Sequence, residues 1–156
     1  MNPTELRIAA VVPCHNEEAA VAKVVTDLRA AVPGIVVYVY DNRSTDATAE
    51  RARAAGAVVR TESVKGKGNV VRRAFADIEA DVYVMIDGDD TYDAAAAPRM
   101  IEELMSGPYD HVLGVRKQDV GTQAYRAGHE AGNRMLNGVV GKVFGENVED
   151  MLSGYR

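Results

Sequence analysis

Short apolar runs alternate with amphipathic stretches along the first two thirds of the chain. Each run is apolar at consecutive positions, which is typical of strands covered on both faces of a parallel sheet. The predicted strands are residues 8–12, 35–40, 57–60 and 81–86. Between them, apolar side chains recur at the three- and four-residue spacing of one buried helical face, in residues 17–32, 44–55 and 66–80. The pattern therefore predicts alternating strands and helices.

The last third of the chain departs from this alternation. Residues 97–106 predict a helix, residues 109–114 a strand, and residues 124–144 a long helix with an apolar stripe. There is no internal repeat and no linker, so residues 1–156 are expected to form a single domain. Because connections between parallel strands are right-handed, we expect an α/β fold, a Rossmann-like three-layer sandwich with a mainly parallel central sheet.

Composition narrows the class of protein. Apolar residues make up 47% of the 156 positions and charged residues 26%, which excludes a disordered chain. The net charge of −5, without a dominant basic run, argues against nucleic acid as a partner. No apolar run is long enough to span a bilayer, and residues 1–7 show no secretory pattern. These features predict a cytoplasmic protein.

Cys14 is the only cysteine, which excludes an internal disulfide and a zinc site built from several cysteines. His15 follows it directly. The members of a Cys–His dyad are usually distant in sequence, so this adjacent pair does not indicate a cysteine nucleophile.

Polar residues follow each of the four predicted strands. In an open parallel sheet, ligands bind in the crevice outside the carboxyl ends of the strands. The four strand exits are residues 13–18, 41–46, 65–69 and 87–91. Because these ends meet at one edge of the sheet, we expect the four polar segments to form one site.

The exit of the fourth strand carries Asp87-Gly88-Asp89. Two carboxylates that flank a glycine at a strand end can share one hard divalent cation, which takes oxygen ligands. An ordinary acidic turn is the alternative, since Asp and Gly are common in turns. The buried strand before it and the three other polar exits favour a site for Mg²⁺ or Mn²⁺ at Asp87 and Asp89.

Two other exits carry weaker signals. Residues 65–69 can offer backbone N–H groups and Lys67 to a phosphate at a helix N-terminus, although the spacing is not that of a P-loop and a flexible loop explains it equally well. Asp41 can accept a hydrogen bond from a ribose hydroxyl or a base N–H. The same loop can also cap the next helix through Ser44 or Asp46, and both interpretations can hold together.

The four loops, in this order, resemble those of the family 2 nucleotide-sugar glycosyltransferases, which have the GT-A fold. The resemblance rests on Pro13-Cys-His-Asn-Glu17, on residues 41–48, on Lys65-Gly-Lys-Gly68 and on Asp87-Gly-Asp89. Three later segments are similar to the polyprenyl-phosphate sugar transferase branch, which includes the dolichol-phosphate mannose synthases. These segments are Gly114-Val-Arg116, Arg126 with Asn133, and residues 150–156.

The resemblance implies roles for individual residues. It implies a nucleotide site at Pro13, His15 and Glu17, and base recognition at Asp41 with Asn42. The glycine-rich turn would place Lys67 and Gly68 at the donor phosphates, and the metal motif would be Asp87, Gly88 and Asp89. Arg116 and Arg126 match basic residues near the diphosphate or the acceptor phosphate, and Asp150 is similar to an acceptor-side base.

The sequence also departs from the family pattern. Thr91 stands where many mannose synthases carry a glutamine two residues after the second metal aspartate, and His15 replaces the commoner tyrosine. Family domains normally continue beyond the segment that ends at Arg156. We therefore expect a donor part at about residues 8–115 and a truncated acceptor part at about residues 116–156.

The activity that the resemblance implies is inverting transfer of a hexose from a UDP- or GDP-linked sugar, dependent on Mg²⁺ or Mn²⁺. The acceptor would be a polyprenyl phosphate or another precursor of a cell-envelope glycan, reached at the inner face of the membrane by a cytoplasmic or peripheral protein. The alternative is a non-catalytic or truncated module that only binds sugar nucleotides. A nucleotidyltransferase is disfavoured, because residues 13–17 are not a glycine-rich phosphate loop.

Overall fold

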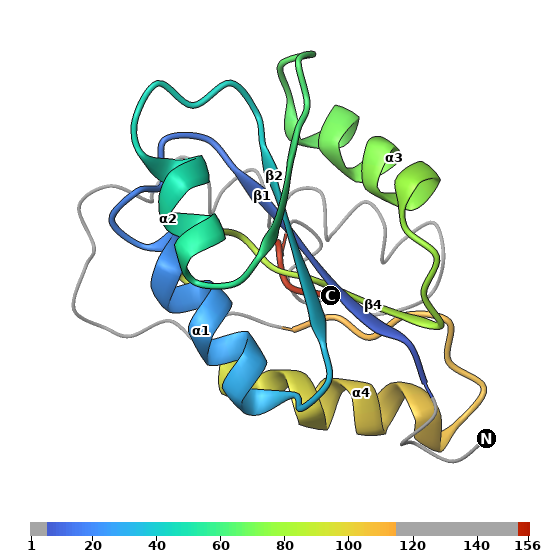
Figure 1. Ribbon diagram of the computed structural model, residues 1–156. Helices are drawn as coiled ribbons and strands as arrows, with labels where there is room; N and C mark the ends of the chain where they lie inside the picture. Colours follow the sequence, from blue (N-terminus) through green and yellow to red (C-terminus); the bar gives the residue numbers. More distant parts are fainter. Residues whose placement is uncertain (1–5, 115–152) are drawn as a thin grey trace, which may run out of the picture.

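A four-stranded parallel sheet forms the centre of the molecule (Figure 1). The computed structural model describes residues 6–114 and 153–156. The strands have the order β3-β2-β1-β4, in which β1 pairs with both β2 and β4. Their bounds are β1 Ile8–Cys14, β2 Val36–Asp41, β3 Val58–Thr61 and β4 Val82–Met85. All four lie within two residues of the strands that the apolar runs predict.

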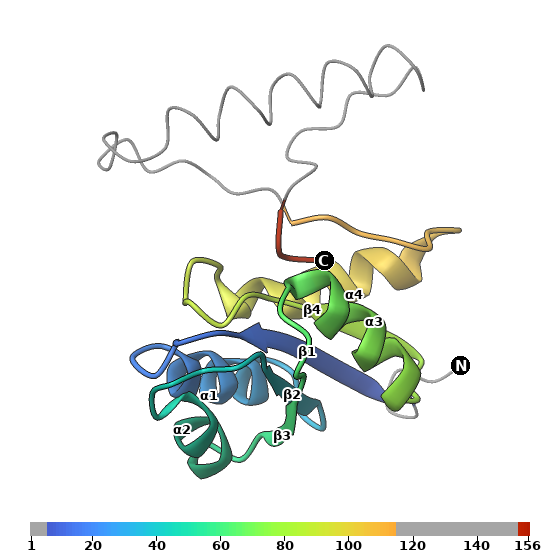
Figure 2. The same cartoon turned by 90° about the horizontal axis from the view of Figure 1, so that it is seen from above.

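Helices cover both faces of this sheet (Figure 2). They are α1 Val21–Ala31, α2 Thr48–Ala54, α3 Lys67–Asp77, the short 3₁₀ helix η2 Ala94–Ala96, and α4 Ala97–Ser106. Helix α3 packs on one face, while α1, α2 and α4 lie on the other. The predicted three-layer sandwich is therefore confirmed.

The two faces of the sheet explain why the strand sequences are continuously apolar. Successive side chains of a strand point to opposite faces. Ala10 and Val12 of β1 belong to the core shared with α1, whereas Ala9 and Val11 belong to the core shared with α3. All four side chains are buried. An alternating strand would have left one of these helices without an apolar partner.

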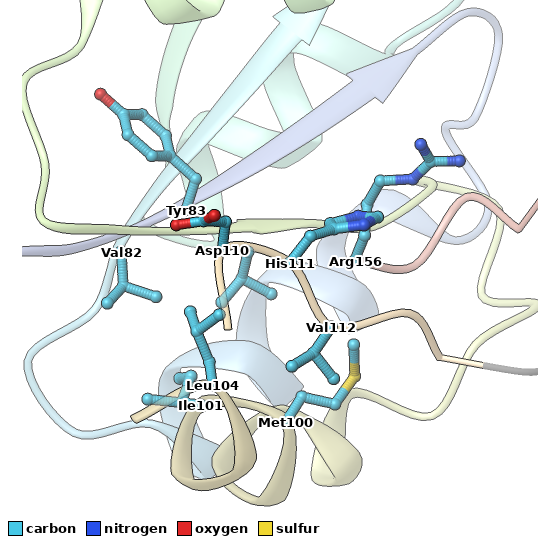
Figure 3. Close-up of a pocket in the computed structure, with 10 residues that line it drawn as sticks. Val82, Tyr83, Met100, Ile101, Leu104, Asp110, His111, Val112 and Arg156 are labelled. Carbon is cyan, nitrogen blue, oxygen red and sulfur yellow. The ribbon is translucent and has the colours of Figure 1, made fainter. Parts of the chain in front are cut away.

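The predicted strand at residues 109–114 is wrong. These residues form no strand, and Met85 of β4 instead exchanges two backbone hydrogen bonds with Arg156. Residues 110–112 cross between α4 and β4, where they help to line a pocket of about 50 Å³ (Figure 3). In this pocket Val112 lies beside Met100, so its apolar character reflects packing on α4 rather than sheet pairing.

The predicted helix at residues 124–144 lies outside the described residues. Within residues 6–114 and 153–156, no helix is both long enough and apolar enough to cross a membrane.

Candidate functional site

A cleft of about 270 Å³ opens at the carboxyl edge of the sheet. It is bordered by the exits of β1, β2 and β4 and by the start of α3. The residues that line it are Pro13, Cys14, His15, Glu17, Asn42, Lys67, Val70, Asp87, Gly88 and Asp89. All but Cys14 and Val70 are residues that the sequence singles out for a site. The structure therefore brings these predicted site residues together at one place.

Three loops at this edge turn back sharply through left-handed backbone conformations. Asn16, Arg43 and Asp90 have φ values of 58°, 66° and 60°, and they follow β1, β2 and β4. Such conformations are costly for residues other than glycine and persist where neighbouring contacts hold them. The side chain of Asn16 accepts a hydrogen bond from the N–H of Thr45 at 2.8 Å, and Lys23 binds Asp90 at 2.9 Å. Strained backbone at three strand exits is typical of a functional edge.

The loops after β1 and β2 are hydrogen-bonded to each other. The backbone N–H groups of Asn16 and Glu17 donate to Ser44 Oγ at 2.9 Å and Thr48 Oγ1 at 2.8 Å. The N–H of Ser44 in turn donates to Asp41 Oδ1 at 3.2 Å. Asp41 is buried and is not among the residues that line the cleft, and its carboxylate holds this turn. Its predicted contact with the base stays a prediction.

The alternative role of this loop, capping the next helix, is not filled at the N-cap position, which is Ala47 and makes no side-chain hydrogen bond to α2; the nearest contact comes from Asp46. Its Oδ1 accepts a hydrogen bond from the N–H of Thr48, the first residue of α2, at 3.0 Å. The Thr48 hydroxyl and N–H lower the pKa of the Asp46 carboxyl. Residues 44–47 therefore belong to the loop, and α2 begins later than the helix predicted from residue 44.

Asn42 uses its whole amide group to hold a third loop. Its Nδ2 donates to the carbonyl oxygens of Glu62 and Val64 at 2.8 and 2.9 Å, and its Oδ1 accepts from the N–H of Gly66 at 2.8 Å. The residue is only 7% exposed. Asn42 thus fixes the segment that leads into α3, and through it the backbone at Lys67.

His15 lies exposed at the mouth of the cleft. Its Nδ1 is 2.9 Å from the carbonyl oxygen of Asn42. A carbonyl oxygen only accepts, so Nδ1 is the donor in this contact. The ring is thereby held in one orientation beside the cleft.

Asp87 and Asp89 follow β4 and face the same cleft. A Cβ on Gly88 would overlap the Cys14 sulfur, so only glycine allows β1 and the Asp87–Asp89 turn to approach this closely. Asp87 forms an ion pair with Lys67 from the start of α3. Asp89 Oδ1 accepts from the Thr91 N–H at 3.1 Å and from the Thr91 hydroxyl at 2.6 Å. Thr91 therefore fixes the second aspartate of the motif.

Charge is concentrated in this cleft. Burial raises the pKa of Glu17, and the negative charges of Asp89, Asp46 and Asp87 raise it further. Burial also raises the pKa of the Cys14 thiol, with smaller contributions from the nearby carboxylates. A thiol with a raised pKa stays protonated at neutral pH, which agrees with the expectation that Cys14 is not a nucleophile.

The two carboxylates of Asp87 and Asp89 suit a hard divalent cation whose coordination shell is completed by a bound ligand. Residues 6–114 and 153–156 contain no group of three or more His, Cys, Asp or Glu side chains arranged to hold a metal ion. Mg²⁺ is commonly bound by only one or two carboxylates together with substrate phosphates and water. Asp87 and Asp89 supply that number of carboxylates.

A segment without an assigned role in the sequence lies directly behind Asp87. A Cβ on Gly154 would overlap the Asp87 carboxylate, and the Gly154 N–H donates to the hydroxyl of Tyr92 at 2.7 Å. The ring of Tyr155 packs against that of Tyr92, with 5.7 Å between centroids. In the sequence, the signal for this contact is the resemblance of residues 150–156 to the polyprenyl-phosphate sugar transferases, but that resemblance assigns no role to Gly154.

The remaining predicted residues are not at the cleft or are not described. Gly68 is exposed in the first turn of α3 and does not line the cleft. Arg116, Arg126 and Asp150 lie outside the described residues.

Comparison with known proteins agrees with this architecture. Residues 9–150 match the family described as glycosyl transferase family 2. The chain belongs to this family. It is 51% identical over 122 residues to Protein RfbJ of Shigella flexneri, covering 78% of this chain and 95% of that one. It is 40% identical over 156 residues to glycosyltransferase AglJ of Haloferax volcanii, covering 99% of this chain and 50% of AglJ.

Two further similarities concern function. A dolichyl-phosphate hexose transferase of Haloferax volcanii is 31% identical over 149 residues, covering 96% of this chain and 64% of that protein. Glucosyl-3-phosphoglycerate synthase of Mycobacterium tuberculosis, solved with Mn²⁺, UDP-glucose and phosphoglyceric acid, superposes with a TM-score of 0.74 at 26% identity. That match covers 97% of this chain and 56% of the synthase. The fold is thus GT-A, and the chain spans about half the length of AglJ and of the synthase.

Proposed function

We propose that the cleft binds the nucleoside diphosphate of a sugar donor together with Mg²⁺ or Mn²⁺, and that the protein transfers the hexose with inversion. The observation that carries this proposal is the meeting of Asp87 and Asp89 with Lys67 at the carboxyl edge of the sheet. The solved synthase with Mn²⁺ and UDP-glucose supports the choice of ligands.

Several cleft residues have a defined task in this proposal. Asp87 and Asp89 hold the cation, which when bound supplies Lewis-acid charge to the leaving diphosphate. Lys67 adds a fixed positive charge at the phosphates. The oriented ring of His15 offers a planar surface to the base at the cleft mouth, and Pro13 and Glu17 line the same wall.

The proposed acceptor is a polyprenyl phosphate or another cell-envelope glycan precursor. The similarity to the dolichyl-phosphate hexose transferase supports this choice. A lipid phosphate is already anionic near neutral pH and needs positioning, a task we assign to Arg116 and Arg126. A hydroxyl acceptor would need a base, and Asp150 is the candidate. Such an acceptor would place the protein at the inner membrane face.

A sugar-nucleotide-binding module without transfer activity is the second candidate. The observation that favours it is that the tasks assigned to the cleft residues all concern the donor and the cation. Binding and turnover separate the two functions. Tight metal-dependent donor binding without sugar transfer or donor hydrolysis would support the module.

The test of the site is calorimetric titration with UDP, GDP and their hexose conjugates, with and without Mn²⁺. We expect donor binding that requires the metal and is lost in Asp87→Ala with Asp89→Ala. The matched control is Asp110→Ala, which removes an exposed carboxylate from the other pocket, between α4 and β4. Metal-dependent binding that survives the double substitution would refute the assignment.

A further inference from the structure

Lys67 forms an ion pair with Asp87, one of the two carboxylates that the proposed function assigns to the cation. Its Nζ contacts Asp87 Oδ1, which links the first residue of α3 to the exit of β4. The side chains are 46% and 27% exposed, so the ion pair is open to solvent and to a ligand in the cleft. An ammonium and a divalent cation repel each other, so they compete for the same oxygen.

The charges around the ion pair explain the role of Lys67 in the cleft. Of the residues that line the cleft, Lys67 carries the only fixed positive charge, and three carboxylates, of Glu17, Asp87 and Asp89, line the same cleft. Without a cation in the cleft, Lys67 therefore offsets part of an excess of negative charge. A divalent cation bound at the two aspartates would replace that function.

The backbone below Lys67 is fixed while its side chain can reorient. The N–H of Gly66 is bound by Asn42, and the carbonyl of Lys65 accepts from Asn69 Nδ2 at 3.1 Å. A lysine carries a point charge on a flexible four-carbon stem. The ammonium can thus leave Asp87 and reach a neighbouring anion without any movement of α3.

We propose that Lys67 is an internal counterion that holds Asp87 until a divalent cation displaces it toward the phosphates of the donor. This inference rests on the proposed function. It follows that the cation alone binds weakly, because it must displace Lys67. It also follows that cation and nucleotide strengthen each other's binding by the same factor, because the diphosphate gives the released ammonium a new partner.

The experiment measures Mn²⁺ binding to the 156-residue chain by the electron paramagnetic resonance signal of free Mn²⁺, with and without UDP. We expect Lys67→Met to bind Mn²⁺ alone up to about fivefold more tightly than the original chain, the factor that an exposed ion pair of ~1 kcal/mol represents. The gain in Mn²⁺ affinity on adding UDP should shrink in the same variant.

Two variants serve as controls. Lys67→Arg keeps the positive charge beside Asp87 and should bind Mn²⁺ alone as weakly as the original chain. Lys65→Met removes the same charge from an exposed position in the same loop and should leave Mn²⁺ binding unchanged. Circular dichroism and the melting temperature establish that all variants fold.

The outcomes separate this inference from the proposed function. If Lys67→Met binds Mn²⁺ alone no more tightly than the original chain does, while that chain shows Mn²⁺-dependent UDP binding, the counterion role is wrong and the donor site stands. If the original chain binds neither Mn²⁺ with UDP nor Mn²⁺ with GDP, both proposals fail. A tighter Mn²⁺ site in Lys65→Met would also contradict the counterion role. It would show that any positive charge in this loop weakens Mn²⁺ binding, whether or not it contacts Asp87.

Discussion

Replacing Asn42 by alanine tests whether this residue holds the loop before α3 or contacts the nucleotide. The substitution removes three hydrogen bonds, to the carbonyls of Glu62 and Val64 and from the N–H of Gly66. At about 1 kcal/mol for each bond, the free energy of unfolding should fall by about 3 kcal/mol. For a domain of this size that corresponds to a melting temperature lower by about 6–12 °C.

Asn42→Asp sharpens the test because it preserves the shape of the side chain. The introduced carboxylate can still accept from Gly66, but it places an oxygen against the carbonyls of Glu62 and Val64. We therefore expect Asn42→Asp to be less stable than Asn42→Ala at pH 7. Protonation restores one donor and is favoured in the folded state, so the deficit against the original chain should shrink as the pH falls toward 5.

The measurement is urea denaturation followed by circular dichroism, paired with UDP titration in the presence of Mn²⁺. Asn69→Ala is the matched control, because Asn69 donates one side-chain bond, to Lys65, and accepts one from Arg72 at 3.4 Å. It should cost less than about 1 kcal/mol, because both of its side-chain hydrogen bonds are exposed to solvent. If Asn42→Ala were equally mild while UDP binding was lost, the amide would contact the nucleotide and the positioning role would be refuted.

Three further predictions concern the surroundings of the metal motif. Gly154→Ala should weaken Mn²⁺ binding, measured by calorimetry, and lower the free energy of unfolding, measured by urea denaturation. The stability cost should be smaller in an Asp87→Ala background, where the overlapping carboxylate is absent. An equal cost in both backgrounds would contradict this. Glu17→Gln should stabilise the metal-free protein above pH ~4.3, because the raised pKa of Glu17 makes its ionised form unfavourable in the folded state. Urea denaturation should show that this gain in the free energy of unfolding disappears at lower pH. A gain that does not depend on pH would refute the reasoning. Cys14 should react with iodoacetamide far more slowly than a free thiol at pH 8, as followed by mass spectrometry, because it is buried with a raised pKa; a rate equal to that of free cysteine would refute this.

The strands could be predicted from the sequence because their burial is uniform. Val11 and Val12 point to opposite faces of β1, and each face is covered by helices, so no polar residue interrupts the run. The helix starts were less predictable. Residues 17–20 continue the helical spacing, but the N–H of Glu17 binds Thr48, the first residue of α2, and α1 begins at Val21.

The strand error at residues 109–114 has a different origin. Local propensity does not say which segment pairs with an exposed strand edge. Arg156 takes the place beside Met85, and Gly114 donates its N–H to the carbonyl of Tyr155 at 2.9 Å. The pairing therefore depends on a segment about forty residues further along the chain.

The candidate site was predictable as a set of positions but not as a network of contacts. Topology alone places four strand exits at one edge, and that edge carries the cleft. The partners of Asn42, by contrast, are backbone groups of residues 62–66, and no spacing rule links them to position 42. The approach of Gly154 to Asp87 is equally non-local.

The sign of the charge in the cleft bears on the proposed metal dependence. Three carboxylates, of Glu17, Asp87 and Asp89, line it against the single ammonium of Lys67. A nucleoside diphosphate is itself anionic, so this arrangement repels it until further positive charge is present. A divalent cation at the two aspartates supplies two positive charges beside the phosphates and neutralises the local excess of negative charge. The acidic cleft thus favours a cation that is required for nucleotide binding over a cation that merely improves it. Measurable UDP binding without any divalent ion would argue against this requirement.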